Sequence, residues 1–255
     1  MQKRIIPVLT IDNDSMVKVI RFKEKLYLGD PLNIVKMFND LEVDELVLID
    51  IGATKNNRIN FKLLRNIASQ AFIPLTYGGG IKSKEDIKKL MNIGYERFVI
   101  NSKFYDSDIS FINELINEFG SQSIVLSIDI KKDSLNEFKI YNYLEDNYRE
   151  ISLDSLIQKL NQYPLGELFF NFVDNDGVME GMDLIKVSAL SKKINNRALF
   201  IGGVGSFADI KSFFNIVNDS LGVGSYFIFS NKKTRGVLIN YLSTEQLKDL
   251  NNNND

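Results

Sequence analysis

Gly78-Gly79-Gly80-Ile81-Lys82-Ser83-Lys84-Glu85-Asp86-Ile87-Lys88 has a second copy in the chain, Gly202-Gly203-Val204-Gly205-Ser206-Phe207-Ala208-Asp209-Ile210-Lys211. At an offset of 123 residues (202 − 79) the two copies align without a gap. The identical positions of the first copy are Gly79, Gly80, Ser83, Asp86, Ile87 and Lys88, and further along Ser102 falls on Ser225. Each copy is typical of a turn from a strand into a helix. Both halves of the chain therefore carry the same strand, glycine turn, helix and next strand.

The glycine turn has a physical use as an anion site. Glycine permits positive φ and lets a ligand approach the bare main chain. Ser83 and Ser206 each stand three residues before an aspartate, which resembles a capping box. A helix that begins just after such a turn offers free N–H groups to an anion. Either copy alone is explained by a tight turn, but the matching pair favours two facing phosphate sites and a ligand phosphorylated at both ends.

Composition limits the chemistry that the chain can perform. The chain has 255 residues, 44% apolar and 25% charged, which predicts one domain over residues 1–255 with a substantial core. The net charge of −2 does not favour a nucleic-acid partner. Without cysteine or histidine the chain has no disulfide or thiol chemistry and lacks the commonest general base and metal ligand, so carboxylates, lysine and tyrosine remain for proton transfer. We expect no metal and no cofactor.

The chain shows no signal for a membrane. Residues 1–10 lack the apolar stretch of a signal peptide, and no apolar run approaches a spanning length. These observations predict a cytoplasmic protein without membrane association.

Short apolar strands alternate with helices along the chain. Strands are predicted at residues 5–9, 46–49, 74–77, 98–100, 124–128, 168–172, 199–201 and 221–224. Helices are predicted from Asp30-Pro31 onward and at residues 61–70, 83–91, 108–119, 153–160, 183–193, 207–216 and 234–250. A polar connection at 11–29 can hold a small hairpin at 17–22, an insertion at 131–147 can hold a surface strand at 138–143, and a frayed tail is expected at 251–255.

Eight βα units in about 250 residues fit a (β/α)₈ barrel. Near-continuous apolar strands are typical of parallel sheets buried on both faces. A doubly wound open sheet is the competing α/β arrangement. The duplication favours the closed alternative, so the predicted fold is a single (β/α)₈ TIM barrel built from two half-barrels. Active sites of that fold lie at the C-terminal ends of the strands, where both glycine turns fall.

Asp129 is the strongest candidate for acid–base chemistry. It ends the fifth predicted strand, so its carboxylate can point into the barrel mouth; the alternative is a simple ion pair with Lys131 or Lys132. Thr10 holds the corresponding place at the end of the first strand, where a symmetric pair requires a carboxylate. Asp12 shares a face with Thr10 if the strand extends, although a solvated loop position is predicted for it.

Other polar residues lie at both ends of the strands. Asn101-Ser102 and Gly224-Ser225 end the fourth and eighth strands beside the glycine turns and can donate to a phosphate. Asp50 also ends a strand, and Asp174-Asn175-Asp176-Gly177 predicts a turn rather than a metal site. At the opposite end, four charges that can form a closed ring of ion pairs begin strands: Arg4, Glu45, Arg97 and Glu167. On the residues alone these charges are polar plugs of the barrel floor.

Several segments together resemble the cyclase subunit of imidazole glycerol phosphate synthase, over Lys3 to about Leu242. They are Lys3-Arg4-Ile5-Ile6-Pro7, Asp44-Glu45-Leu46-Val47, Ile73-Pro74-Leu75-Thr76-Tyr77-Gly78-Gly79-Gly80-Ile81, Ile100-Asn101-Ser102, Phe119-Gly120-Ser121-Gln122 and Asp174-Asn175-Asp176-Gly177. The resemblance implies a duplicated barrel that takes ammonia from a glutaminase subunit docked on the N-terminal face. It also implies a phosphorylated small-molecule substrate.

The resemblance assigns roles to residues of this chain. Asp129 matches one member of the family's catalytic aspartate pair, and the four floor charges match its ammonia gate: Arg4, Glu45, Arg97 and Glu167. The implied phosphate-binding residues are Gly79, Gly80, Asn101, Ser102, Gly177, Gly202, Gly203, Gly224 and Ser225.

The chain departs from the family mainly at the cyclase end. Thr10 stands where the family has the second aspartate, Val178 where it has threonine, Ile201 where it has serine, and Asn171-Phe172 where it has Thr-Ser. Two of these changes add bulk where the substrate is expected. In the floor, Arg97 replaces a lysine. This pattern resembles paralogues that serve a glutaminase and a separate amidotransferase of bacterial surface sugars. Three functions stay open. The first is an ammonia-conducting subunit for such a pathway. The second is a cyclase of histidine biosynthesis that makes imidazole glycerol phosphate and AICAR, with Asp12 or a water in place of the missing aspartate, and the third is a non-catalytic scaffold that activates the glutaminase.

Overall fold

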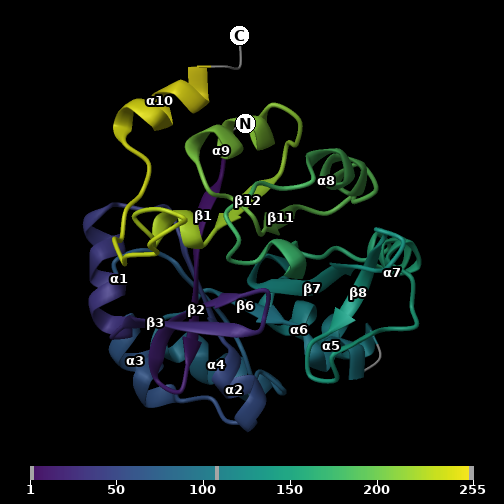
Figure 1. Cartoon of the computed structure of the whole chain (residues 1–255). Helices are drawn as coiled ribbons and strands as arrows, with labels where there is room; N and C mark the ends of the chain where they lie inside the picture. Colours follow the sequence, from purple (N-terminus) through teal and green to yellow (C-terminus); the bar gives the residue numbers. More distant parts are fainter. Residues whose placement is uncertain (1–2, 107–108, 253–255) are drawn as a thin grey trace.

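Eight parallel strands close into a barrel in the computed structural model, which describes residues 3–106 and 109–252 (Figure 1). Every strand pairs in parallel with its neighbour, and the last pairs with the first. The predicted closed barrel is therefore confirmed. Its strands, in order around the barrel, are β1 (Ile5–Asp12), β4 (Leu46–Asp50), β5 (Leu75–Gly78), β6 (Arg97–Ile100), β7 (Ile124–Lys132), β10 (Glu167–Phe172), β11 (Ala198–Ile201) and β12 (Ser220–Val223).

Helices surround the barrel (Figure 1), and in the described residues seven of them begin at a residue whose side chain caps the helix. The Asp30 carboxylate accepts the N–H groups of Leu32 and Asn33, so the first helix begins where Asp30-Pro31 predicts it. The helices are α1 (Pro31–Asp40), α2 (Ile51–Asn56), α3 (Phe61–Ala68), α4 (Lys84–Ile93), α5 (Ser102–Asp106), α6 (Ile109–Phe119), α7 (Leu153–Leu160), α8 (Leu184–Ser191), α9 (Phe207–Phe214) and α10 (Thr244–Asn252). No helix in the described residues is both apolar enough and long enough to cross a membrane.

The sequence duplication is also present in the backbone. Gly79 and Gly202 have φ values of 127° and 126°, and the next glycine of each copy also has positive φ. Ser83 and Ser206 each accept the N–H of the aspartate three residues on. At the offset of 123 residues, strand β5 coincides with β11 and β6 with β12. The two half-barrels therefore share one geometry at this turn and in the strands on either side of it.

Two hairpins extend the barrel strands beyond the mouth. Strands β2 (Ser15–Ile20) and β3 (Glu24–Gly29) form a hairpin that pairs with β1. The prediction of a polar connection over residues 11–29 with only a small hairpin at 17–22 is therefore wrong, because most of this segment is β-strand. Strand β7 continues into β8 (Phe138–Asn142) and β9 (Asn147–Tyr148). The predicted strand at 138–143 exists, but Ile140 and Tyr141 are buried, so it is not a surface strand.

Helix prediction failed in three places. The short helices α2 and α5 were not predicted. The predicted helix at 234–250 begins only at Thr244, because Arg235 has a φ of 49° and Gly236 follows it, which breaks a helix there. Helix α10 then runs through Asn252, so the frayed tail predicted at 251–255 is wrong for residues 251 and 252; residues 253–255 lie outside the described residues. Figure 1 places α10 beside the start of β1, where the Lys3 ammonium donates to the Leu250 carbonyl.

The core has two parts, separated by the barrel wall. The larger part lies between the strands and the helices. The smaller part fills the barrel interior, and its members alternate along each strand as inward-facing positions do. It consists of Ile6, Val8, Val47, Val99, Val125, Phe169, Leu199 and Ile201. This apolar plug separates the charged floor from the mouth.

Candidate functional site

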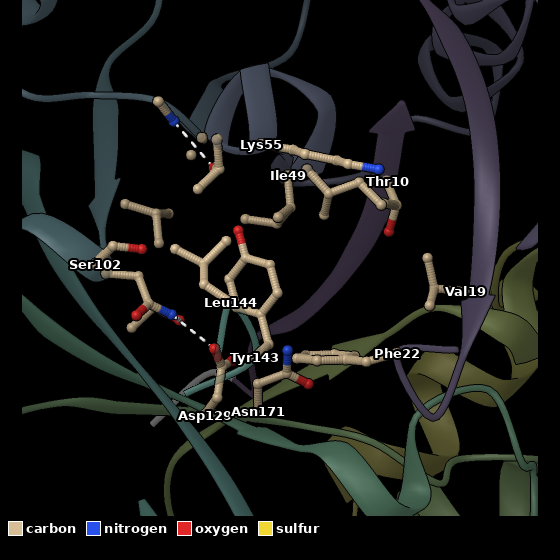
Figure 2. Close-up of a pocket in the computed structure, with 18 of the residues that line it drawn as sticks. Thr10, Val19, Phe22, Ile49, Lys55, Ser102, Asp129, Tyr143, Leu144 and Asn171 are labelled. Atoms are coloured by element: carbon tan, nitrogen blue, oxygen red, sulfur yellow. Dashed lines mark hydrogen bonds between the residues drawn. The ribbon is translucent and has the colours of Figure 1, made fainter. Parts of the chain in front are cut away.

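A cavity of about 500 Å³ opens at the C-terminal ends of the strands (Figure 2). Its floor is the top of the apolar plug, including Val8, Phe169 and Ile201. Its polar wall contains Asp129 with two amide side chains, Asn101 and Asn171. This is the size and composition of an ordinary small-molecule site.

Asp129 is buried between the two amides of the wall. Asn101 Nδ2 donates to its carboxylate at 2.8 Å, and Asn171 also hydrogen-bonds it. Burial raises the pKa of Asp129 to about 6, against the lowering effect of the amides. The alternative pairing is wrong, because Lys131 lies over the Tyr141 ring and Lys132 pairs with Asp183. A carboxyl group with this pKa can take or give a proton near neutral pH.

Thr10 lies across the cavity from Asp129, as Figure 2 shows. Asp12 is not a cavity residue; its carboxylate lies 2.5 Å from the Lys25 ammonium. The predicted solvated loop position is wrong, since β1 runs through Asp12 and buries it. Asp129 therefore has no second carboxylate opposite it at the end of β1.

Asp176 and Lys18 form a second polar group that the sequence reading missed. Both side chains are buried, both line the cavity, and Lys18 Nζ lies 2.5 Å from Asp176 Oδ1. The turn predicted at 174–177 exists, and it begins with a 3₁₀ segment, η2 (Val173–Asn175). The available signal for Lys18 was its place as a single cation within the apolar run Met16-Val17-Lys18-Val19-Ile20.

Asp50 has a structural role as the N-cap of α2. Its carboxylate accepts the Ala53 N–H at 2.7 Å as the cap of α2 and the Tyr77 hydroxyl at 3.3 Å. Burial raises the pKa of Asp50 to about 6. Asp50 does not line the cavity, because the neighbouring Ile49 is the inward-facing residue of β4.

The first glycine turn is part of the cavity wall. Gly79, Gly80, Asn101 and Ser102 all line it. The Gly80 N–H donates to Thr54 Oγ1 at 3.1 Å. Three lysines also line the cavity: Lys55 on α2, Lys82 in the loop after the glycine turn and Lys103 on α5. Figure 2 shows the Lys55 side chain extending toward Thr10.

The second glycine turn is not part of the cavity wall. None of its predicted phosphate-binding residues lines the cavity: Gly177, Gly202, Gly203, Gly224 and Ser225. The β2–β3 hairpin covers this side, with the Arg21 N–H donating to the Asp176 carbonyl at 2.9 Å. A Cβ on Gly177 would lie 2.6 Å from the Val19 carbonyl oxygen.

Not all of the residues at the barrel mouth that differ from the cyclase family face the cavity. Ile201 lines it, whereas Phe172 packs against Phe138 and Phe200 on the outer side of the barrel wall. The expectation that Phe172 adds bulk inside the mouth is therefore wrong. Phe22 of the first hairpin and Tyr143 of the second meet edge to face, with ring centroids 6.1 Å apart, and both line the cavity.

At the opposite end of the barrel, the four predicted charges form a closed ring. Arg4 contacts Glu45 at 2.7 Å and Glu167 at 2.6 Å. Arg97 contacts the same two carboxylates at 2.9 Å and 2.6 Å. Each arginine thus bridges both glutamates and each glutamate bridges both arginines.

Hydroxyl groups complete the ring. Thr76 donates to Glu45 at 2.7 Å, and Ser220 Oγ accepts from Arg4 at 2.9 Å. Burial alone would raise the pKa of Glu45, but Arg97 and Arg4 overcome it and hold the pKa below its ordinary value. The Glu45 carboxylate is therefore ionised at neutral pH, and the ring closes the floor of the barrel.

Comparisons with known proteins agree with this geometry. Residues 4–233 match the family model described as histidine biosynthesis protein. A protein of Pseudomonas aeruginosa named as imidazole glycerol phosphate synthase subunit hisF2 is 36% identical over 96% of this chain and 98% of its own length. A hisF3 subunit of Vibrio vulnificus is 35% identical over 97% and 96%, and a HisF subunit of Leptospira interrogans is 32% identical over 98% and 99%. With a closed barrel, a matching family model and relatives of full length, the chain belongs to the histidine biosynthesis protein family, as a divergent member of its imidazole glycerol phosphate synthase cyclase branch.

Proposed function

We propose that this chain receives ammonia from a glutaminase docked on its N-terminal face and conducts it through the barrel to a separate amidotransferase of surface sugars in the cytoplasm. The observation that carries the proposal is the closed ring of Arg4, Glu45, Arg97 and Glu167 on the barrel floor. The apolar plug lies directly between that ring and the cavity.

The two layers suit passage of ammonia rather than ammonium. The ring pairs two guanidinium groups with two carboxylates and has no net charge, so the selection rests on the apolar side chains above it, which give a cation no hydrogen-bond partner. Transfer of an unpaired charge into such surroundings is very costly, whereas a small neutral molecule meets a far lower barrier. The ring is a gate in this proposal because one arginine must release its carboxylates to open it.

The cavity supports the non-cyclase function. Removing one partner of a positioned acid–base pair typically costs 10²–10⁴-fold in rate. Thr10 stands where the second carboxylate belongs, and Asp12, which does not line the cavity, is paired with Lys25. Phosphate binding at the two glycine turns stays a prediction, and the cavity reaches the first of them.

A working cyclase is the second candidate. Asp129 supports it, because burial raises its pKa to about 6 and it lines the cavity. Ammonium salt and the cyclase substrate separate the two functions. A turnover rate near that of a two-aspartate cyclase of the family would establish the cyclase and contradict our proposal.

The direct test mixes the purified chain with the glutaminase of its own cell. We expect a stable complex and faster glutamate release from glutamine. With ¹⁵N-amide glutamine and the amidotransferase present, labelled nitrogen should enter the sugar even when unlabelled ammonium is in excess. Failure of the two chains to associate contradicts the proposal. Association and activation without label transfer would leave only a scaffold.

A further inference from the structure

Two opposite walls of the mouth cavity carry opposite charges. Thr10 lies on β1 and Asp129 on β7, and in the barrel order β1, β4, β5, β6, β7 these strands stand four places apart, so the two residues face each other across the barrel axis. Lys55 of α2 extends toward Thr10 (Figure 2). One wall therefore presents an ammonium with a hydroxyl, and the facing wall presents a carboxylate.

The Asp129 carboxylate has acceptor capacity left for a ligand. Its residue is only 4% exposed, and in the part of the chain that the structure describes it takes part in no ion pair. Its hydrogen bonds come from the neutral amides of Asn101 and Asn171. An ionised carboxylate has about four acceptor sites, so hydroxyl groups of a ligand can occupy those that remain.

The Lys55 ammonium is available to an anion. Within residues 3–106 and 109–252 no ion pair engages it, and it lies in the last turn of α2, away from the free N–H groups at the start of that helix. The aspartate that the family has at residue 10 would place a negative charge beside this ammonium, whereas Thr10 adds only a hydroxyl. One cation and one hydroxyl match a singly charged group such as a carboxylate.

An apolar layer and an aromatic ring lie between the two walls. Ile49 and Phe169 belong to the cavity floor, and the Tyr143 ring covers the middle of the cavity (Figure 2). Tyr143 is held there by a hydrogen bond with Thr54 and by its edge-to-face contact with Phe22. A sugar ring has an apolar C–H face that packs against an aromatic ring and hydroxyl groups around its edge, and the cavity of about 500 Å³ accommodates one such ring.

We propose that the mouth cavity binds a sugar acid of monosaccharide size. Its carboxylate lies at Lys55 and Thr10, its hydroxyl groups bond Asp129 and the neighbouring amides, and its ring lies under Tyr143. The replacement of an aspartate by Thr10 then has a positive role, since it removes the charge that would repel the ligand's carboxylate. The site itself does not depend on the proposed passage; if the passage operates, ammonia leaves the apolar plug beneath this ligand.

Isothermal titration of the purified chain with D-glucuronate, D-glucose and acetate tests the assignment, because glucuronate combines the ring of glucose with the carboxylate of acetate. We expect glucuronate to bind roughly tenfold more tightly than either of the others, since it alone reaches both walls. Equal binding of glucuronate and glucose would overturn the role of the Lys55 wall, and equal binding of glucuronate and acetate would overturn the sugar body. Absence of binding by all three at millimolar concentration would overturn the proposal as a whole.

Two pairs of variants locate the carboxylate. Lys55→Gln should weaken glucuronate roughly tenfold and leave glucose unchanged, whereas Lys62→Gln on α3, outside the cavity wall, should change neither. Thr10→Asp should weaken glucuronate through like charge, and the neutral, similarly shaped Thr10→Asn should weaken it less. Equal losses for Thr10→Asp and Thr10→Asn would overturn the placement of the carboxylate. Ammonia transfer is measured without these probes, so failure of this site and failure of the proposed passage are separate results.

Discussion

Glu167→Ala tests the floor ring at its most buried residue. Glu167 is 0% exposed and accepts from Arg4 and Arg97, each at 2.6 Å. Its removal leaves two guanidinium groups to share Glu45. Breaking a buried pair typically costs about 3–5 kcal/mol. The side chains of Arg4 and Arg97 are 30% and 19% exposed, so water can solvate part of the released charge. We therefore expect the free energy of unfolding to fall by about 3 kcal/mol, the low end of that range.

Urea denaturation followed by circular dichroism measures this loss. The control is Asp154→Ala, which breaks the Lys193–Asp154 pair, whose side chains are 52% and 61% exposed. Such a surface pair contributes about 0–1 kcal/mol. In the glutaminase complex, Glu167→Ala should also lower the amount of transferred nitrogen per glutamate released. A cost no larger than that of Asp154→Ala would refute the energetic reasoning, and an unchanged ratio would refute the gate.

Three further results are expected. Thr10→Asp should raise turnover of the cyclase substrate with ammonium salt above that of the unchanged chain; equal rates would show that the missing carboxylate does not limit the reaction. Burial raises the pKa of Asp129 from 3.8 to about 6, so the native state binds more protons between these values and the free energy of unfolding falls as pH rises through this window. Asp129→Asn should remove about 3 kcal/mol of that fall. In urea denaturation the variant should therefore be more stable than the unchanged chain at pH 7 but not at pH 3.5. An equal difference in the free energy of unfolding at both pH values would contradict the burial argument. Lys18→Met should cost about 3–5 kcal/mol because it leaves Asp176 buried without its partner, and Lys18→Met with Asp176→Leu should recover most of this loss in the same denaturation measurement; no recovery would place the cost in packing.

The barrel could be predicted because its signals are local. Each strand is a short apolar run, and each glycine turn has a serine and an aspartate at fixed spacing behind it. The floor ring was also predictable, since Arg4, Glu45, Arg97 and Glu167 each stand at the start of a strand, and strand starts meet at one end of a parallel barrel. These features need only the order of elements.

The mouth could not be predicted to the same depth, because long-range packing decides it. Nothing local indicates that the β2–β3 hairpin covers the second glycine turn, or that Lys18 reaches Asp176, 158 residues further along the chain. Asp12 was misplaced for the same reason: the hairpin extends β1 and buries it. Phe172 follows Asn171 on β10, and only the observed barrel shows which of the two faces inward.

The floor ring also bears on how the two half-barrels recognise each other. The first half, with β1, β4, β5 and β6, supplies Arg4, Glu45 and Arg97, and the second half supplies Glu167. The first half thus brings two cations and one anion, and the second brings the missing anion. Two copies of the first half would meet with an excess of two positive charges on their axis. The floor ring is therefore charge-balanced only when the two unlike halves meet.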